Sequence, residues 1–507
     1  MTSDGCEAAP SRQQGVLSNF LSLLVGSLSV QAINFCYQVY AARSLGPDNF
    51  GTFSFIIAIV VMLGVCVSFG RGPVIIREIA VSDAARRHCV IRAALWQHLL
   101  ISSVGALLLC GGSWFIPRLS SHLIYIGLAA GSLVAVGAGA VLDAYFKGAR
   151  RMAVSSVSMV LRVVTKAVIG VALLWYGLSV LSLFVALLCS DVLATVFLVV
   201  AYHLHTGRWP LPGRRAEGRM LLYDGAQIAL SDLTGAAFNR FDWIFLGSLK
   251  AAATVGVYSA AYRFFEILIH VPGQMAVAAF PTICESEGRP GDNRPQLILA
   301  LKLAVLPGCV ACAFLYFWAA PVILLVLGPA YAEAPLLLQV LGLSLPFHGA
   351  CGILYHLAIA RRRQRYLVWS SGACALANIL LCLLLIPRWG GLGAAMAMVL
   401  PSVLQVFLLA LAARETASLP GVLWCGVKAA TVATVIGVNA HALSLVGCPW
   451  PATLGVALVL VAPAVWAWSG LDAHEKQRVL RLVQRLLGRP RLLHGPPEQT
   501  DAVRATK

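Results

Sequence analysis

SDLTGAAFNRFDWIFLGSLKAAATVGVYSAAYRFFEILIH, residues 231–270, joins two apolar segments that carry an unusual set of polar and ionisable side chains, namely Asp232, Asn239, Arg240, Asp242, Arg263, Glu266 and His270. With its flanking residues, each segment is long enough to cross a membrane as a helix. A charge at the centre of a bilayer costs roughly 2.5–3.5 kcal/mol on insertion scales. The sequence therefore predicts that this helical hairpin faces a polar interior rather than lipid.

The composition excludes a soluble globular protein. Of the 507 residues, 59% are hydrophobic and 12% are charged, and the mean hydropathy is +0.82. Soluble domains carry about 25% charged residues. Apolar segments of helical length recur along the whole chain and leave no room for a large soluble domain. We therefore expect an all-α, polytopic membrane protein.

About fourteen transmembrane helices are predicted. Their approximate bounds are 16–41, 52–70, 90–112, 122–142, 153–176, 179–202, 224–247, 254–282, 297–327, 335–359, 366–387, 391–413, 421–444 and 450–470. Basic residues gather in alternate loops, whereas the opposite loops hold only Arg43, Arg118, Lys250 and Arg388. By the positive-inside rule, both termini are expected in the cytoplasm. Topology thus accounts for the net charge of +17, and no nucleic-acid-binding motif accompanies it.

The chain contains an internal repeat. FGTFS at 50–54 resembles VGVYS at 255–259, and the basic turn at 147–151 corresponds to the one at 361–365. The Gly-Leu pairs at 177–178 and 391–392 keep nearly the same offset. Six spans per half predict two lobes of the same orientation, related by an axis along the membrane normal.

We therefore expect a cytoplasmic tail at 1–15, an N-terminal lobe at 16–202, a cytoplasmic linker at 203–223, a C-terminal lobe at 224–413, two additional helices at 421–470 and a basic cytoplasmic tail at 471–507. In this tail, 476–489 has the pattern of an amphipathic helix on the inner leaflet. A solvated basic tail is the alternative.

The fifth predicted span carries Arg162 and Lys166, four residues apart and hence on one helix face. Two adjacent cations require an anion or carboxylates opposite them. One interpretation is ion pairing with Asp191 or Asp143, and the other is a site for a phosphate-bearing ligand. The residues alone leave both open.

The hairpin at 231–270 also allows two interpretations. Asp232, Glu266 and His270 have the chemistry of a proton or cation relay, whereas Arg263 and Glu266 alone would form an ion pair that holds the hairpin together. Together, Arg162, Lys166, Arg240 and Arg263 would form a basic chamber. On the first span, the polar stripe of Gln31, Asn34 and Gln38 is expected to face this cavity rather than lipid.

No catalytic triad, phosphate-binding loop or metal-ligand spacing occurs at a convincing site in the sequence, and the predicted extracytoplasmic loops are short. We therefore expect a protein that is not an enzyme and that uses no cofactor or metal.

Five motifs carry a resemblance to a known family: AARSLGPDNFG at 41–51, REIA at 77–80, YFKG at 145–148, Asn239 with Asp242, and GVYSAAYR at 256–263. They resemble the polysaccharide or O-antigen flippase family, over about residues 15–415. That family belongs to the superfamily that includes multidrug and toxin extrusion transporters and the lipid II flippase.

The resemblance implies a two-lobed transporter in the bacterial cytoplasmic membrane. It would move an undecaprenyl-pyrophosphate-linked oligosaccharide to the periplasmic leaflet by alternating access, for exopolysaccharide, capsule or O-antigen synthesis. The implied partners are this lipid-linked substrate, membrane lipids, and the polymerase and export machinery. The residue roles rest on the burial of charge and are not carried over from the family. The expected substrate-binding residues are Arg162, Lys166, Arg240, Arg263 and Asn239, and those expected to couple an ion or form ion pairs are Asp232, Asp242, Glu266, His270 and Asp191.

Other functions remain open at this point. A cation-coupled multidrug exporter is expected to have a cavity of carboxylates and aromatic rings rather than four cations. A membrane polysaccharide polymerase or ligase is expected to have a large periplasmic loop with essential Arg or His. A lipid II flippase is a near neighbour, and its loss would be lethal to the cell.

Overall fold

The computed structural model describes residues 10–115, 120–213, 217–287, 294–413 and 419–445, with short pieces at 449, 451–457, 459–460 and 476–477. Within these residues the chain is helical and contains no strand. The helices are α1 (Pro10–Ser68), α2 (Arg71–Val81), α3 (Ala84–Phe115), α5 (Leu123–Gly148), α6 (Met152–Trp175), α7 (Ser179–Thr206), α8 (Glu217–Leu249), α9 (Ala252–Glu287), α10 (Arg294–Leu327), η1 (Pro329–Tyr331), α11 (Ala334–Gly342), α12 (Leu345–Ala360), α13 (Gln364–Trp389), α14 (Gly391–Ala413) and α15 (Leu419–Leu445).

The helices have the length and composition of membrane spans. Among the described residues, nine helical stretches are long and apolar enough to cross a bilayer, and the first, Ser29–Val81, includes part of the first predicted span and all of the second. Every predicted span up to 421–444 contains a described helix. The expected all-α membrane fold is confirmed. The last predicted span and the amphipathic tail helix lie largely outside the described residues, so the count of fourteen stays a prediction.

Helix α1 contains two spans separated by a sharp kink at Gly46. This residue has φ 71° and ψ 172°, a conformation that is essentially restricted to glycine, and Pro47 follows it. Before the kink, Phe35 packs edge-to-face on Phe264 of α9, with ring centroids 5.1 Å apart. After the kink, Phe53 packs on Phe184 of α7 at the same centroid distance. The kink therefore takes α1 from one group of helices to the other.

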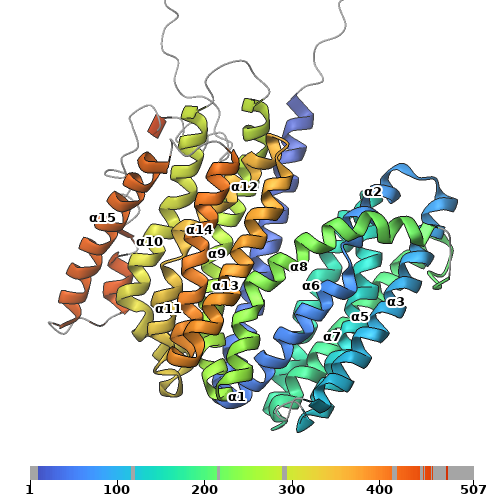
Figure 1. Ribbon diagram of the computed structural model, residues 1–507, viewed down its shortest axis with the longest axis horizontal. Coiled ribbons are helices and arrows are strands. Elements are labelled where there is room, and N and C mark those ends of the chain that lie inside the picture. The colour runs from blue at the N-terminus through green and yellow to red at the C-terminus, as the bar shows by residue number, and fades with distance from the viewer. Residues whose placement is uncertain are drawn as a thin grey trace, which may run out of the picture.

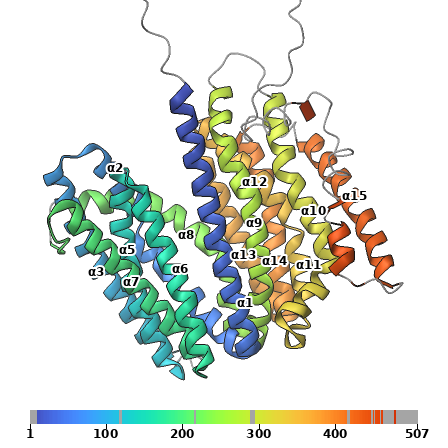
Figure 2. The ribbon, with the colours of Figure 1, turned by 180° about the vertical axis from the view of Figure 1, so that it is seen from behind.

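Two groups of helices, called here the first and second lobes, form the molecule (Figures 1 and 2). The first lobe contains the second half of α1 with α2, α3, α5, α6 and α7, and the second contains α9 to α14, with α15 at its outer edge beside α10. The lobes meet near the kink of α1 and diverge towards the side on which α1 begins. We call that side the basic side, because the turns after α5 and α12 that carry Lys and Arg belong to it.

The lobes touch where α1, just after its kink, crosses the start of α9. Gly51 and Gly256 lie at this crossing, and a Cβ on either residue would collide with the backbone of the other helix. Glycine allows two helix backbones to approach more closely than any other residue does. The two sequence segments that form the internal repeat are thus packed against each other.

The two basic turns also share their local geometry. Arg150 and Arg362 both have positive φ, of 60° and 56°, although neither is glycine. In each turn the next residue donates its backbone N–H back to the helix, Arg151 to Phe146 and Arg363 to Ala358, at 2.8 Å in both cases. In the corresponding turns on the other side, Gly177 and Gly390 have positive φ, of 82° and 54°. The sequence repeat pairs Gly177 with Gly391, so in the second turn the positive φ lies one residue earlier than the repeat predicts.

Helix α8 connects the lobes. Its first turns contact α2 and α3, whereas its later turns pack along α13 in the second lobe (Figure 1). Gly225 lies so close to the left-handed Gly70 that a Cβ on Gly225 would be 2.6 Å from the carbonyl oxygen of Phe69. This start of α8 is held against the first lobe by backbone contact.

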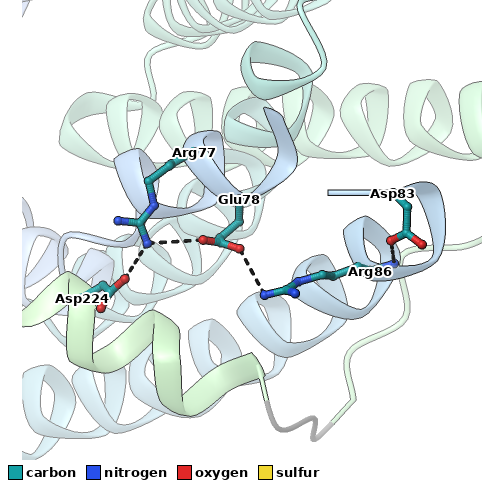
Figure 3. A network of polar contacts seen from close by, with 5 residues as sticks. All are labelled: Arg77, Glu78, Asp83, Arg86 and Asp224. Atoms are coloured by element: carbon teal, nitrogen blue, oxygen red, sulfur yellow. Dashed lines mark hydrogen bonds and ion pairs between the residues drawn. The ribbon is translucent and has the colours of Figure 1, made fainter. Parts of the chain in front are cut away.

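An ion-pair network lies beside that contact (Figure 3). Arg77 of α2 is 2.5 Å from Asp224 of α8 and 3.3 Å from Glu78. Arg86 of α3 lies 3.5 Å from the other oxygen of Glu78. The network joins α2, α3 and α8 at the basic side.

Candidate functional site

The centre of the candidate site is a carboxylate between two guanidinium groups. Glu266 on α9 accepts a hydrogen bond of 2.8 Å from Nη1 of Arg263, one turn earlier on the same helix. Its other oxygen lies 3.9 Å from Nη2 of Arg240 on α8. All three side chains are mostly buried, with at most 31% exposed. The structure thus contains the predicted Arg263–Glu266 pair, and adds a second arginine that leaves the group with an excess positive charge.

Trp243 packs against both arginines. The Cζ atom of Arg240 is 5.0 Å from the centre of its ring, and that of Arg263 is 5.3 Å away. The indole is fully buried and lies edge-to-face with Tyr262 at 5.4 Å. An aromatic face attracts a cation within about 6 Å of its centre. Trp243 is not among the site residues expected from the sequence, although its position three residues after Arg240 places both on one helix face.

The first span supplies the polar wall of the site. Asn34 accepts a hydrogen bond of 2.7 Å from the ammonium group of Lys166 on α6. A cavity of about 10 Å³, close to the volume of one water, is lined by Gln31, Asn34, Phe35, Arg263, Glu266 and Ile267. Asn34 therefore lies between a cation of the first lobe and the ionic group of the second. Gln31 and Asn34 of the predicted stripe do face this polar region.

Lys166 also lies over the ring of Tyr37, at 5.7 Å from its centre. Its partners thus come from α1, and its positive charge has no carboxylate within ion-pair distance among the described residues. The ion-pairing interpretation of the sequence does not apply to Lys166.

The surroundings of Arg162 agree better with the ion-pairing interpretation than those of Lys166 do. Its Nη1 atom lies 3.8 Å from Asp191 on α7, and Asp191 also accepts a hydrogen bond from the hydroxyl of Ser132 on α5. Asp143, the other carboxylate considered, pairs instead with Lys147 at 2.6 Å. This cluster is internal to the first lobe.

Asp242 is fully buried next to Trp243 and accepts a hydrogen bond from the hydroxyl of Tyr258 on α9. The backbone N–H of Trp243 donates to its other oxygen at 2.9 Å. Nearby, Asn378 of α13 donates to the carbonyl oxygen of Ala397 on α14 at 2.9 Å. Asp242 therefore belongs to the interior of the second lobe and not to the polar wall of α1.

One residue of the predicted relay lies apart. Asp232 is exposed and forms no ion pair with any residue that the structure describes, whereas His270 is half-buried one turn beyond Glu266. The side chain of Asn239 lies outside the described residues. The structure thus does not join Asp232 to Glu266 and His270.

A second cavity lies on the opposite side, near the crossing of α1 and α9. It has a volume of about 240 Å³ and includes Gly51, Phe55, His122, Gly247 and Val255 in its lining. These side chains are largely apolar. The charged residues of the candidate site take no part in it.

The family follows from the sequence match. A model of the polysaccharide biosynthesis protein family matches residues 16–287, more than half of the chain. The chain belongs to this family. A curated relative, the probable flippase AglR of Haloferax volcanii, is 26% identical over 280 residues, which are 54% of this chain and 57% of AglR. The match therefore spans little more than half of that relative. The family expected from the motifs is confirmed.

Solved structures share the fold of this family member. The lipid II flippase MurJ in an inward closed conformation has a TM-score of 0.67 at 12% identity, over 92% of this chain and 100% of that one. A multidrug resistance MATE family transporter in an inward-facing conformation has 0.63 at 14% identity, over 77% and 96%. A transporter of the MOP superfamily from Pyrococcus furiosus has 0.55 at 16% identity, over 82% and 95%. This chain shares the fold of these transporters.

Proposed function

We propose that this protein is a flippase that moves a polyprenyl-pyrophosphate-linked oligosaccharide across the cytoplasmic membrane of a bacterium by alternating access. The observation that carries the proposal is a cluster of cations: Arg240 and Arg263 flank Glu266, and Lys166 is bound to Asn34, which lines the same small cavity as Arg263 and Glu266. A pyrophosphate group carries several negative charges and many acceptor oxygens, which suit guanidinium and ammonium donors. The excess positive charge therefore favours an anionic head group over a cationic drug.

The arrangement of the lobes supports alternating access. The site lies between a helix of the first lobe, α6, and two helices that line the second, α8 and α9. With the basic side assigned to the cytoplasm, as the positive-inside rule predicts, the lobes diverge towards the cytoplasm and meet towards the periplasm (Figure 2). In this state the head group enters from the cytoplasm, and its polyprenyl chain remains in lipid.

Each predicted substrate-binding residue has a role in this proposal. The pyrophosphate is bound by Lys166, Arg240 and Arg263. Lys166 exchanges its hydrogen bond with Asn34 for one with the pyrophosphate, and Asn239 contacts the sugar. Arg162 supports the chamber through its pairing with Asp191. In a second proposal, Asp242, Glu266 and His270 take up a coupling ion, with Asp232 at the entrance and Asp191 in the first lobe.

The organisation of the chain is also proposed rather than established. We retain a lobe at 16–202, a linker at 203–223, a lobe at 224–413, two added helices at 421–470 and cytoplasmic tails at both ends. The product would pass to a polymerase and export machinery that make a surface polysaccharide. Exopolysaccharide, capsule and O-antigen are equally compatible with the site.

Reconstitution tests this function. The full chain is placed in liposomes with a fluorescent polyprenyl-pyrophosphate sugar, and the fraction accessible to a reagent added outside is followed over time. The protein is expected to accelerate the exchange of this lipid between leaflets. Arg240→Gln and Arg263→Gln should reduce the rate, whereas Arg219→Gln, on an exposed position of α8, should not. Equal exchange with and without protein would refute the proposal.

A further inference from the structure

The ring of Trp243 packs near both arginines of the site but forms no hydrogen bond with their N–H groups. Its ring centre is 5.0 Å from Cζ of Arg240 and 5.3 Å from Cζ of Arg263. A guanidinium group that packs on a ring uses its flat face, and its five N–H donors lie in its plane. A carboxylate partner would instead occupy those donors.

The carboxylate of Glu266 is shared unevenly between the two arginines. Glu266 is 2.8 Å from Arg263 but 3.9 Å from Arg240, beyond hydrogen-bond distance. The buried Nε of Arg263 has no hydrogen-bond partner among the described residues. Buried polar atoms in native proteins are nearly always hydrogen-bonded. This free donor marks a place where an acceptor-rich ligand is expected.

We propose that Trp243 is a positioning residue that holds the guanidinium groups of Arg240 and Arg263 together against its ring, and so makes the site prefer a pyrophosphate over a single phosphate. This inference rests on the proposed function and adds a specificity to the same site. Trp243 does not touch the ligand in this scheme, because it acts through the two guanidinium groups. Without its ring, each arginine has other rotamers available, and the pair is no longer held for a bidentate anion.

The surroundings of Trp243 support a fixed position for the ring. Asp242, the preceding residue, accepts hydrogen bonds from Tyr258 and from the backbone N–H of Trp243. Tyr262 packs edge-to-face on the indole. Because three side chains of α8 and α9 fix the ring, the ring in turn fixes the two arginines.

The test compares two ligands on the purified full-length protein in detergent, farnesyl pyrophosphate and farnesyl monophosphate. The wild type should bind the pyrophosphate more tightly. Trp243→Leu should weaken pyrophosphate binding about tenfold and monophosphate binding about twofold at most, because a cation–π contact in a desolvated site is of this size. A tryptophan with a purely structural role would weaken both ligands by the same factor.

A graded series keeps the inference testable if Trp243→Leu does not fold. Trp243→Tyr and Trp243→Phe retain an aromatic face of decreasing attraction for cations, so the preference for pyrophosphate should fall in that order. An unchanged preference in folded Trp243→Phe, with both ligands bound by the wild type, would overturn this inference alone. A wild type that binds neither ligand, or both equally, would overturn it together with the pyrophosphate role of the proposed function.

Discussion

Gly51 of α1 and Gly256 of α9 occupy equivalent places in the two repeated motifs, and they face each other at the point where the lobes meet. A Cβ on Gly51 would lie 2.8 Å from the amide nitrogen of Gly256, and a Cβ on Gly256 would lie 3.0 Å from that of Gly51. The same two Cβ atoms would lie 1.8 Å from the carbonyl oxygen of Ala252 and 1.9 Å from that of Pro47, and real Cβ contacts are essentially never shorter than 3.0 Å. The closed end of the molecule therefore depends on the absence of a side chain at both positions.

Gly51→Ala and Gly256→Ala should each separate α1 from α9. Inserting a methyl group into a packed contact costs roughly 1–3 kcal/mol, because the backbones must move apart. We expect a lower melting temperature in detergent and a reduced transport rate. The control is Gly64→Ala on the same helix, where a Cβ would lie 3.5 Å from Leu133, an ordinary contact. If both alanine variants close and transport as the wild type does, the close approach of α1 and α9 is not required for closure or transport.

Asn34→Asp should affect stability and ligand binding in opposite directions. The new carboxylate would form an ion pair with Lys166, whose ammonium group already lies 2.7 Å from the Asn34 oxygen. The melting temperature should rise, and the affinity for farnesyl pyrophosphate should fall, because Lys166 is no longer available to the anion. Asn34→Leu is the matched control, since it removes the partner without adding charge. Equal affinities in Asn34→Asp and wild type would exclude Lys166 from the anion site.

A double-mutant cycle measures the Arg263–Glu266 pair. A hydrogen bond between charged groups contributes about 1.5–3 kcal/mol, and partial exposure of Glu266 reduces this to roughly 1–2 kcal/mol. Arg263→Gln and Glu266→Gln should each lower the free energy of unfolding, and the double variant should lose less than the sum of the two. Strict additivity would show that the pair does not contribute to stability.

The ion pairs of Figure 3 should contribute only weakly to the packing of the start of α8 against the first lobe. Arg77 and Arg86 are 58% and 55% exposed, and exposed ion pairs contribute at most about 1 kcal/mol. Asp224→Asn should therefore lower the free energy of unfolding by less than about 1 kcal/mol, and the effect should shrink in high salt. Arg77→Ala should add little in the Asp224→Asn background. A large, salt-independent loss would point instead to the backbone contact between Gly70 and Gly225.

Much of this architecture follows from sequence alone. Apolar segments of helical length predict the spans, because lipid leaves the backbone no other partner than its own helix. Side-chain pairs within one helix can also be predicted from the sequence, since Arg263 and Glu266 at a spacing of three residues must lie on one face. The polar stripe on the first span gives the face of that helix, as the contact of Asn34 with Lys166 shows.

Contacts between helices cannot be predicted from the sequence in the same way. Nothing in the pattern of α8 reveals that its first turns pack on α2 and its later turns on α13, because crossing angles depend on the fit of both surfaces. For the same reason, the hydrogen bond between Asp242 and Tyr258 and the place of Trp243 between two arginines appear only in three dimensions. Asp232, grouped with Glu266 by depth alone, lies exposed.

The most direct test of the central claim is the leaflet that holds the lipid-linked intermediate in cells. In a deletion strain we expect this intermediate to accumulate on the cytoplasmic leaflet, with loss of the surface polymer. The wild-type gene should restore both, whereas Arg240→Ala, Arg263→Ala and Glu266→Ala should not. If the intermediate instead reaches the periplasmic leaflet in the deletion strain and only remains unpolymerised, flipping is not the step that this protein performs.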